Sequence, residues 1–433
     1  MTKRWLAVLG AIVVMTAACG RDDDVADEAT STTVAAETSF VDTSDCIETP
    51  GGEIEGDVIR IGTVRPASGP YAILDSVASG LEAFVNATNA AGGVTAGDGK
   101  VYRLELVKED DGYDPARTPG RVEKLVEQDG VFAMVGQIGT ANTLAVRDYL
   151  NARCVPSVAA TGSSEWGRVD EYPWFVAALA SYATESVGFL EWLAEEQPGA
   201  SIAVLYQDDD FGKGYLEALE RHAPDLGLSV AASAPYNPLL DASPESKVVD
   251  LAASGADAFV VAMSGSPCPA ALRSVPGGWQ PLTYVSINCS QNMTLGLAQG
   301  RDEGIYTSQA LYDPVADRDE PTVAAFRTDA AAAGLPEPLI DGGLAAAGWQ
   351  FGEIFKRGVE RAEQVDRAGV MNALLSLDAE SIGLFLDGVT GSTDGPDDPW
   401  IVEDLRIAQR REGRWVGVSE VRGHDGRSDS YAG

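Results

Sequence analysis

The stretch VIRIGTV, residues 58–64, is an apolar run rich in β-branched side chains, and it predicts a buried strand. A helical pattern follows, in which Leu81 and Val85 share one face, and Gly92 ends it. Short β-rich runs and helical patterns then alternate along the chain. Such alternation implies a parallel sheet with helices on both faces, an α/β fold.

The same alternation continues through a second unit, and the predicted elements fall into two series. We expect strands at residues 103–107, 131–135, 201–206, 228–233, 256–262 and 282–286, with a late pair at 402–409 and 414–418. We expect helices at residues 115–126, 141–152, 184–196, 214–223, 246–254, 322–333 and 344–363. One core usually stops growing at roughly 250 to 300 residues. A chain of 433 residues with this pattern therefore predicts two α/β units in tandem.

The N-terminus is a targeting segment. Lys3 and Arg4 precede an apolar run at residues 5–15, and small residues lead to Cys19. A run of this length is too short to span a bilayer, which needs about 20 residues. The segment resembles a bacterial lipoprotein signal, which implies that Cys19 is lipidated and becomes the mature N-terminus; ordinary secretion is the alternative. The acidic, aperiodic residues 20–54 predict a disordered tether with a reach of roughly 30 to 35 Å.

Charge and composition exclude several classes of function. The chain has 31 Lys plus Arg against 66 Asp plus Glu, a net charge of −35, so we expect no nucleic-acid partner. Only His222 and His424 are present, which excludes an imidazole-rich metal site. The acidic runs at residues 109–111 and 208–210 lack the spacing of a calcium loop and predict carboxylate-rich turns. We expect neither a metal nor a cofactor.

Four further cysteines fit an oxidising compartment. Cys268 and Cys289 each follow a predicted strand of the same unit by a few residues, so we expect them to pair. Cys46 and Cys154 are then expected to pair, because they are the two that remain. Four cysteines allow three connectivities, and free buried thiols are the alternative.

Ligands of open parallel sheets bind beyond the carboxyl ends of the strands, so the loops that follow strands are candidate binding segments. Five such loops stand in order along the chain: PASGP at 66–70, EDDGYDP at 109–115, GQIGTANT at 136–143, PSVAATG at 156–162 and YQDDDFGKGY at 206–215. Together they resemble type I extracytoplasmic solute-binding proteins, in the Leu/Ile/Val-binding branch that feeds ABC importers. The resemblance extends over about residues 58–418.

This resemblance implies two Rossmann-like lobes joined by a three-segment hinge, the type I periplasmic binding protein fold. Lobe 1 would comprise residues 55–178 and 310–389, lobe 2 residues 181–307 and 394–420, and residues 421–433 a polar tail. The crossings would lie near 178–181, 307–310 and 389–394. The resemblance also implies a protein that closes on a small molecule and delivers it to ABC permease subunits, and a monomer suits this hinge mechanism. The N-terminal signal predicts a location outside the cytoplasm, with an anchor through Cys19.

The resemblance also indicates ligand-binding residues. Thr140, Ala159 and Thr161 match positions that hold a ligand carboxylate in the family. Neutral dipoles at such positions can bind an anion without a buried counter-charge. As a bare pattern, Thr140 is equally a helix cap.

The second lobe should contribute an aromatic wall formed by Tyr182 and Phe211, with core packing as the alternative for both. Leu74 occupies a position where some relatives have a ligand-contacting tyrosine, and Tyr71 is its nearby substitute.

One departure from the family concerns the ligand. Members that bind α-amino acids place an acidic residue where this sequence has Asn288, and there it pairs with the ligand ammonium. Losing that charge-assisted bond would cost about 1.5 to 3 kcal/mol. The ligand is therefore expected to be a carboxylate or amide without an α-ammonium group, with an amino-acid-like solute as the alternative.

Two other functions remain open at this stage. A sensory receptor could use the same fold to signal to a membrane partner. An extracellular enzyme is disfavoured because the loops carry hydroxyl groups without a positioned base, and we place His222 on the surface and His424 in the polar tail.

Overall fold

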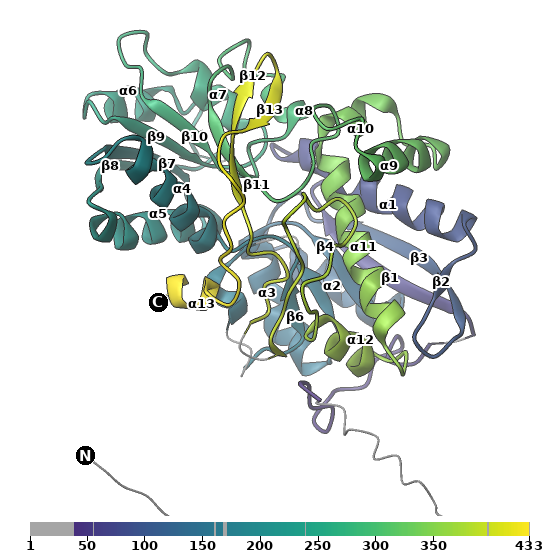
Figure 1. Ribbon diagram of the computed structural model, residues 1–433. Coiled ribbons are helices and arrows are strands. Elements are labelled where there is room, and N and C mark those ends of the chain that lie inside the picture. Colours follow the sequence, from purple (N-terminus) through teal and green to yellow (C-terminus); the bar gives the residue numbers. More distant parts are fainter. Residues whose placement is uncertain are drawn as a thin grey trace, which may run out of the picture. The chain divides into compact units, whose positions relative to one another are not determined.

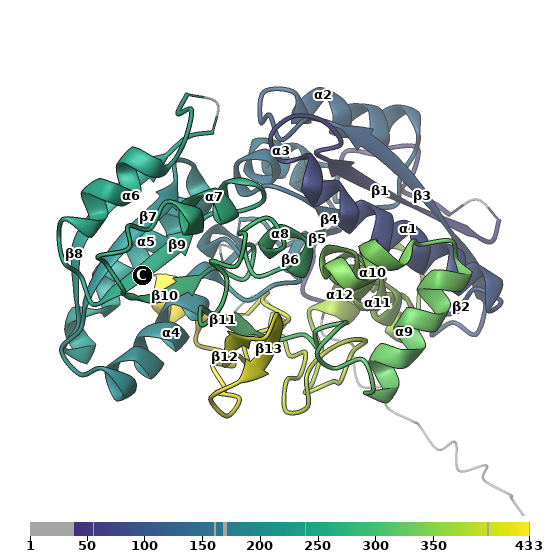
Figure 2. The same ribbon diagram turned by 90° about the horizontal axis from the view of Figure 1, so that it is seen from above.

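The computed structural model describes residues 39–432, except residues 55, 160, 161, 168–170, 239, 396 and 397. The chain forms two sheets with helices on both faces of each. Figures 1 and 2 show the second sheet and its helices on the left and the first sheet on the right. Cys19 and the rest of residues 1–38 lie outside the described part. No helix in the described part combines the length and apolar character needed to cross a membrane.

The first sheet has the strand order β2-β3-β1-β4-β5-β6 and is parallel except for β2, which pairs antiparallel with β3. Its strands are β1 (Val58–Arg65), β2 (Val94–Thr95), β3 (Val101–Asp110), β4 (Ala133–Gln137), β5 (Ser157–Ala159) and β6 (Phe175–Ala177). The helices around it are α1 (Asp75–Ala90), α2 (Thr118–Glu123), α3 (Thr140–Ala152), α9 (Pro321–Ala332), α10 (Glu337–Gly342), α11 (Leu344–Arg361) and α12 (Arg367–Leu374). Every residue of β4 is buried, as expected for a central strand covered on both faces.

The second sheet has the order β13-β12-β11-β10-β9-β7-β8, with β12 and β13 antiparallel at one edge. Its strands are β7 (Ser201–Gln207), β8 (Ser229–Tyr236), β9 (Ala258–Ala262), β10 (Leu282–Val285), β11 (Tyr306–Gln309), β12 (Arg406–Arg411) and β13 (Arg414–Gly417). Its helices are α4 (Tyr182–Glu196), α5 (Asp210–His222), α6 (Glu245–Ala252), α7 (Pro267–Arg273) and α8 (Asn292–Leu295). The predicted α/β fold is confirmed.

A close helix contact joins the early and late parts of the first lobe. Helices α1 and α11 cross where Gly80 faces Ala345 and Gly348 faces Val77. A Cβ atom on Gly80 would lie 1.9 Å from the carbonyl oxygen of Ala345, and one on Gly348 1.8 Å from that of Val77. Only glycine allows the two backbones to approach so closely. Because α11 follows β11 in the chain, the chain returns to the first sheet before it adds β12 and β13 to the second.

The chain passes between the sheets three times. The first passage lies between β6 and α4, and the second follows β11, where the amide of Leu386 donates to the carbonyl of Ala310 (3.0 Å). The family resemblance implies a third passage near residues 389–394, but the structure places it later in the chain. Trp400 still pairs with Ala177 beside β6, so the passage comes between Ile401 and β12. Backbone hydrogen bonds to Ala177 keep residues 399–401 beside β6 of the first sheet.

The expected tether ends earlier than residue 54. Cys46 and Cys154 form a disulfide, and the amide of Ile47 donates to the carbonyl of Ala152 (2.9 Å). The guanidinium of Arg367 donates to Thr49 Oγ1 (2.8 Å). These contacts hold residues 39–54 against the first lobe, a result that composition alone does not reveal. The structure also contains the second expected disulfide, Cys268–Cys289.

The expected polar tail, residues 421–433, is also folded. Arg422 pairs with Leu405, and the chain ends in α13 (Ser428–Ala432), which packs against α4. Ser428 Oγ lies 2.5 Å from Thr184 Oγ1. His424 is buried within this polar segment, and burial lowers its pKa to about 4. Polar side chains are accommodated here because they bond to one another.

Candidate functional site

A pocket lies where the carboxyl ends of the parallel strands in both sheets face each other. The loops after β3, β4, β9, β10 and β11 line it, together with the starts of α1, α4, α5 and α11. The space open to the centre of a water molecule is about 110 Å³, which suits a small solute. The pocket occupies the position that the topology of open α/β sheets favours for ligands.

Thr140 lines this pocket from the first lobe, as the sequence predicts. It begins α3, and the preceding Gly139 has a φ of 98°. A Cβ atom on Gly139 would lie 2.4 Å from Asn142 Oδ1, so the turn that presents Thr140 requires glycine. Thr140 Oγ1 lies 2.8 Å from the hydroxyl of Tyr182. That hydrogen bond joins the first lobe to α4 of the second.

Tyr182 and Phe211 form an aromatic wall. Tyr182 begins α4 and Phe211 lies at the start of α5, and both line the pocket. Their rings meet edge to face with centroids 5.0 Å apart, and Tyr215 stacks on Tyr182 at 4.9 Å. The two aromatic residues that the resemblance indicated are therefore brought together, and each is also packed into the second lobe.

Tyr113, and not the predicted Tyr71, is among the residues that line the pocket. Tyr71 is buried and stacks on Tyr113 at 4.1 Å, and Leu74 lines the pocket beside them. The amide of Tyr113 donates to Asp111 Oδ1 (2.9 Å), and its hydroxyl accepts from Gln207 Nε2 (3.3 Å). Tyr113 belongs to the loop quoted at residues 109–115, but sequence reasoning assigned it no role.

The lining of the described pocket contains no Lys, Arg or His. Asn288 lines it in the loop after β10, and Asp313 is its one carboxylate. Both oxygens of Asp313 already accept hydrogen bonds, from the amides of Val315 (2.9 Å) and Ala316 (2.7 Å) and from Asn292 Nδ2 (2.8 Å). Asp313 thus orders its own turn, and the rest of the described lining offers a ligand neutral dipoles and aromatic rings.

Two predicted residues fall at the limit of the described part. Ala159 ends β5, the strand beside β4, but its side chain is not described. Thr161 lies outside the described residues. Their role stays a prediction.

Both acidic runs are engaged locally. Asp209 caps α5 by accepting from the amide of Gly212 (3.2 Å), and Asp208 pairs with Lys213 (3.1 Å). Glu109 pairs with Lys124 (2.7 Å), and Asp110 accepts from the amide of Ala67 (3.0 Å). Caps, turns and ion pairs account for these carboxylates.

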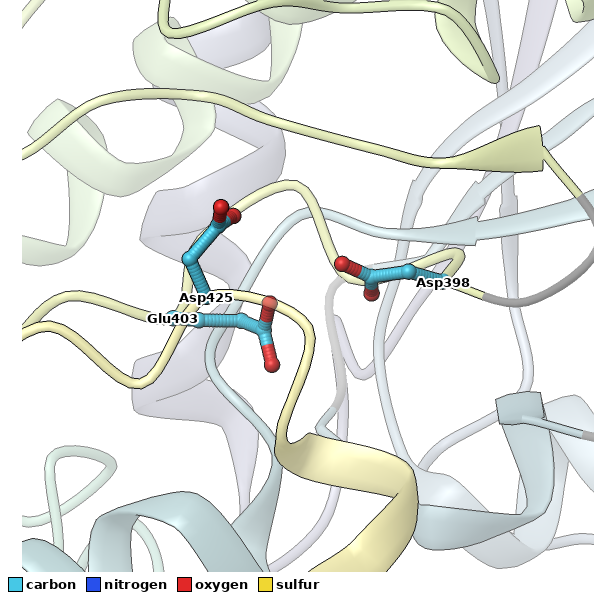
Figure 3. Close-up of side chains that lie close together, drawn as sticks. All are labelled: Asp398, Glu403 and Asp425. Carbon is cyan, nitrogen blue, oxygen red and sulfur yellow. The ribbon is translucent and has the colours of Figure 1, made fainter. Parts of the chain in front are cut away.

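A separate acidic cluster lies at the third passage between the lobes. Figure 3 shows the carboxyl groups of Asp398, Glu403 and Asp425, whose nearest oxygens all lie within 4.8 Å of one another. Glu403 accepts from the amides of Gly426 (2.6 Å) and Ser428 (2.9 Å). Burial, and then the neighbouring Glu403 carboxylate, raise the pKa of Asp398 to about 8.

Asp398→Asn is expected to stabilise the protein at alkaline pH. An acid whose pKa is raised on folding stabilises the fold below its unfolded pKa, and that contribution is lost as pH rises through about 8. The neutral amide removes this loss, so the free energy of unfolding should rise by on the order of 1 to 3 kcal/mol at pH 9 and change little at pH 4.5. Urea denaturation at both pH values measures it. Asp329→Asn, at an exposed carboxyl on α9 outside the cluster, is the control, and an equal gain at both pH values would contradict the assignment.

Comparisons with known proteins agree with this architecture. A family described as periplasmic binding protein matches residues 58–413. The Leu/Ile/Val-binding protein homolog 8 of Brucella abortus (strain 2308) is 26% identical over 208 residues, 46% of this chain and 50% of that protein. The chain thus spans about half the length of the curated relatives it matches.

Solved structures share the fold at low identity. A branched chain amino acid ABC transporter from Thermus thermophilus with bound valine has a TM-score of 0.77 and 18% identity, covering 88% of this chain and 100% of that one. An ABC transporter solute binding protein from R. palustris in complex with 4-hydroxybenzoate has a TM-score of 0.70 and 18% identity, covering 85% and 97%.

The fold and the pocket between two lobes define a type I periplasmic binding protein fold. The chain belongs to the periplasmic binding protein family. This is a family of substrate-binding proteins and not of enzymes, which removes the enzyme alternative.

Proposed function

We propose that this protein works outside the cytoplasm, where it captures a small solute between its two lobes and delivers it to an ABC permease. The proposed solute is a carboxylate or amide without an α-ammonium group. The observation that carries the ligand class is the lining of the pocket. Asn288 stands where a counter-charge for ammonium is expected, and the carboxylate of Asp313 is occupied by three donors. Asp313, already engaged by these donors, would be the one ionic partner left for a ligand ammonium among the described lining residues.

The aromatic wall extends the proposal to ligands with an apolar or aromatic body. Tyr113, Tyr182 and Phe211 present rings to the pocket, and Leu74, Val77 and Phe351 add apolar surface. The hydroxyl of Thr140 and the end of β5 would hold the carboxylate. The neighbour with 4-hydroxybenzoate shows that a protein of this fold can take an aromatic acid, and the neighbour with valine represents the competing ligand class.

Delivery and anchoring complete the proposal. Ligand contacts with both lobes would stabilise the closed arrangement over the open one. A lipid on Cys19 would keep the protein near its permease, and residues 20–38 would serve as the tether.

A thermal-shift screen with matched ligand pairs tests the ligand class. We expect benzoate and 4-methylpentanoate to raise the melting temperature, and leucine, which adds only an α-ammonium group to the latter, to have little effect. Thr140→Val should weaken binding of benzoate by about 10- to 100-fold, since it removes a hydrogen bond to a charged group. Thr140→Ser keeps the hydroxyl and is the matched control. Stabilisation by leucine alone would refute the proposed ligand class.

A further inference from the structure

A buried glutamate lies behind the pocket, outside its lining. Glu185 is in the first turn of α4, and 1% of its surface is exposed. Its Oε1 accepts from the hydroxyl of Tyr284 (2.7 Å) and from the amide of Ile287 (2.9 Å). Its Oε2 accepts from the hydroxyl of Tyr215. One carboxyl group thus connects α4 to α5, to β10 and to the loop after β10.

Each partner of Glu185 leads to the pocket. Ile287 lines it directly and precedes Asn288, the residue expected to select the ligand. The hydroxyl of Tyr284 also lies 2.7 Å from Oγ of Ser308, a lining residue within β11. Tyr215 stacks on Tyr182 of the aromatic wall. Glu185 therefore contacts residues that support three parts of the site: the loop after β10, the end of β11 and the aromatic wall.

The hydrogen-bond pattern requires an acceptor at both oxygens. All three partners donate, so an ionised carboxylate satisfies every donor. When Oε2 carries a proton, that proton is donated to the Tyr215 hydroxyl and the direction of this hydrogen bond reverses, while Oε1 becomes a weaker, neutral acceptor for the amide of Ile287. The geometry favours a tighter loop when Glu185 is ionised.

The surroundings of Glu185 contain tyrosines. Tyr215 faces it from α5, Tyr284 from β10 and Tyr182 from its own helix, while β11 contributes the hydroxyl of Ser308. From the C-terminal segment, Tyr431 packs on Ala183 and Val187 of α4, and His424 approaches Gly188. Burial raises the pKa of Glu185 to about 7, and the three donated hydrogen bonds oppose that rise. Its ionisation therefore changes near neutral pH.

We propose that Glu185 is a positioning residue that fixes the loop of residues 287–291 through the amide of Ile287, and that its ionisation controls how tightly the loop is held and how strongly the pocket binds its solute. This inference rests on the proposed function for its effect on binding. Its effect on the loop is independent of any ligand.

Hydrogen exchange of the ligand-free full chain tests the effect on the loop. After correction for intrinsic rates, protection of residues 285–291 in the wild type should increase about tenfold as pH rises from 5.5 to 8.5. Glu185→Gln keeps the shape and imitates the neutral acid, so its protection should stay at the low value across this range. Glu353→Gln is the matched control, because burial also raises the pKa of Glu353 and its partners, Trp349 and Lys356, lie on α11.

Three exchange results are distinguishable. A loop-confined, pH-independent loss of protection in Glu185→Gln supports the inference. Protection equal to the wild type at every pH overturns it. Faster exchange spread evenly over the second lobe also overturns it, because Glu185 would then only stabilise the fold.

Calorimetric titration with benzoate tests the effect on binding. Wild-type affinity should be several-fold higher at pH 8.5 than at pH 5.5, whereas Glu185→Gln should bind with one lower affinity at both. Benzoate itself is fully ionised over this range, so the ligand does not supply the pH dependence. If benzoate fails to bind the wild type, the proposed ligand class fails, and the exchange data still decide the role of Glu185.

Discussion

Replacing Cys46 and Cys154 together with alanine is expected to lower the free energy of unfolding by about 5 kcal/mol, the largest effect we predict on stability. The two cysteines are 108 residues apart, so their disulfide closes a long loop and removes much conformational entropy from the unfolded chain. The same bond ties the segment before β1 to the chain just after α3. Urea denaturation monitored by tryptophan fluorescence measures the loss.

The second disulfide provides the comparison. Cys268 and Cys289 are 21 residues apart, and their replacement by alanine should cost about 3 kcal/mol on the same entropic argument. All four cysteines are buried or half-buried, so alanine is chosen instead of serine, whose hydroxyl would be left without a hydrogen-bond partner. An equal or smaller loss for the Cys46–Cys154 variant would show that loop length does not govern the stabilisation here.

Asn288→Asp is expected to change the ligand preference, the largest effect we predict on binding. The new carboxylate would face the pocket from the loop after β10 and pair with a ligand ammonium. Affinity for leucine relative to 4-methylpentanoate should rise by about 10- to 200-fold, as expected for one charge-assisted hydrogen bond. Isothermal titration of both ligands against both proteins gives the ratio.

Asp313→Asn is the control that separates two explanations. Asp313 is the other possible partner of an ammonium, although its oxygens accept three hydrogen bonds within the protein. We expect this variant to leave the ratio of the two affinities unchanged. If the wild type prefers leucine and Asp313→Asn abolishes that preference, Asp313 supplies the counter-charge and the argument from Asn288 is wrong.

Local pattern was sufficient to predict most elements of the fold. The run at residues 58–64 becomes β1, and the expected helix at 344–363 becomes α11 (Leu344–Arg361). Both are long or strongly apolar, and a buried strand or an amphipathic helix imposes its own period on the sequence. The family resemblance then supplied the two-lobe arrangement.

Composition was misleading at both ends of the folded chain. Residues 39–54 and 421–432 are polar, yet the structure orders them through a disulfide, a buried guanidinium and side-chain hydrogen bonds. Composition describes how much apolar surface a segment can bury, but these segments are held by a few specific partners far away in the sequence. Arg367, for example, meets Thr49 across 318 residues.

For the site, the order of strands and loops predicted binding segments at the carboxyl ends of the strands, and three of the five predicted loops contribute residues to the described lining. The family resemblance indicated Thr140, Tyr182, Phe211 and Asn288, and all four line the pocket. The residues that support these four could be identified only from the folded chain. Glu185 reads in sequence as an ordinary helical residue, and its role depends on donors 30, 99 and 102 residues away. Hydrogen bonding acts over a few ångströms in space, so sequence spacing carries no trace of it.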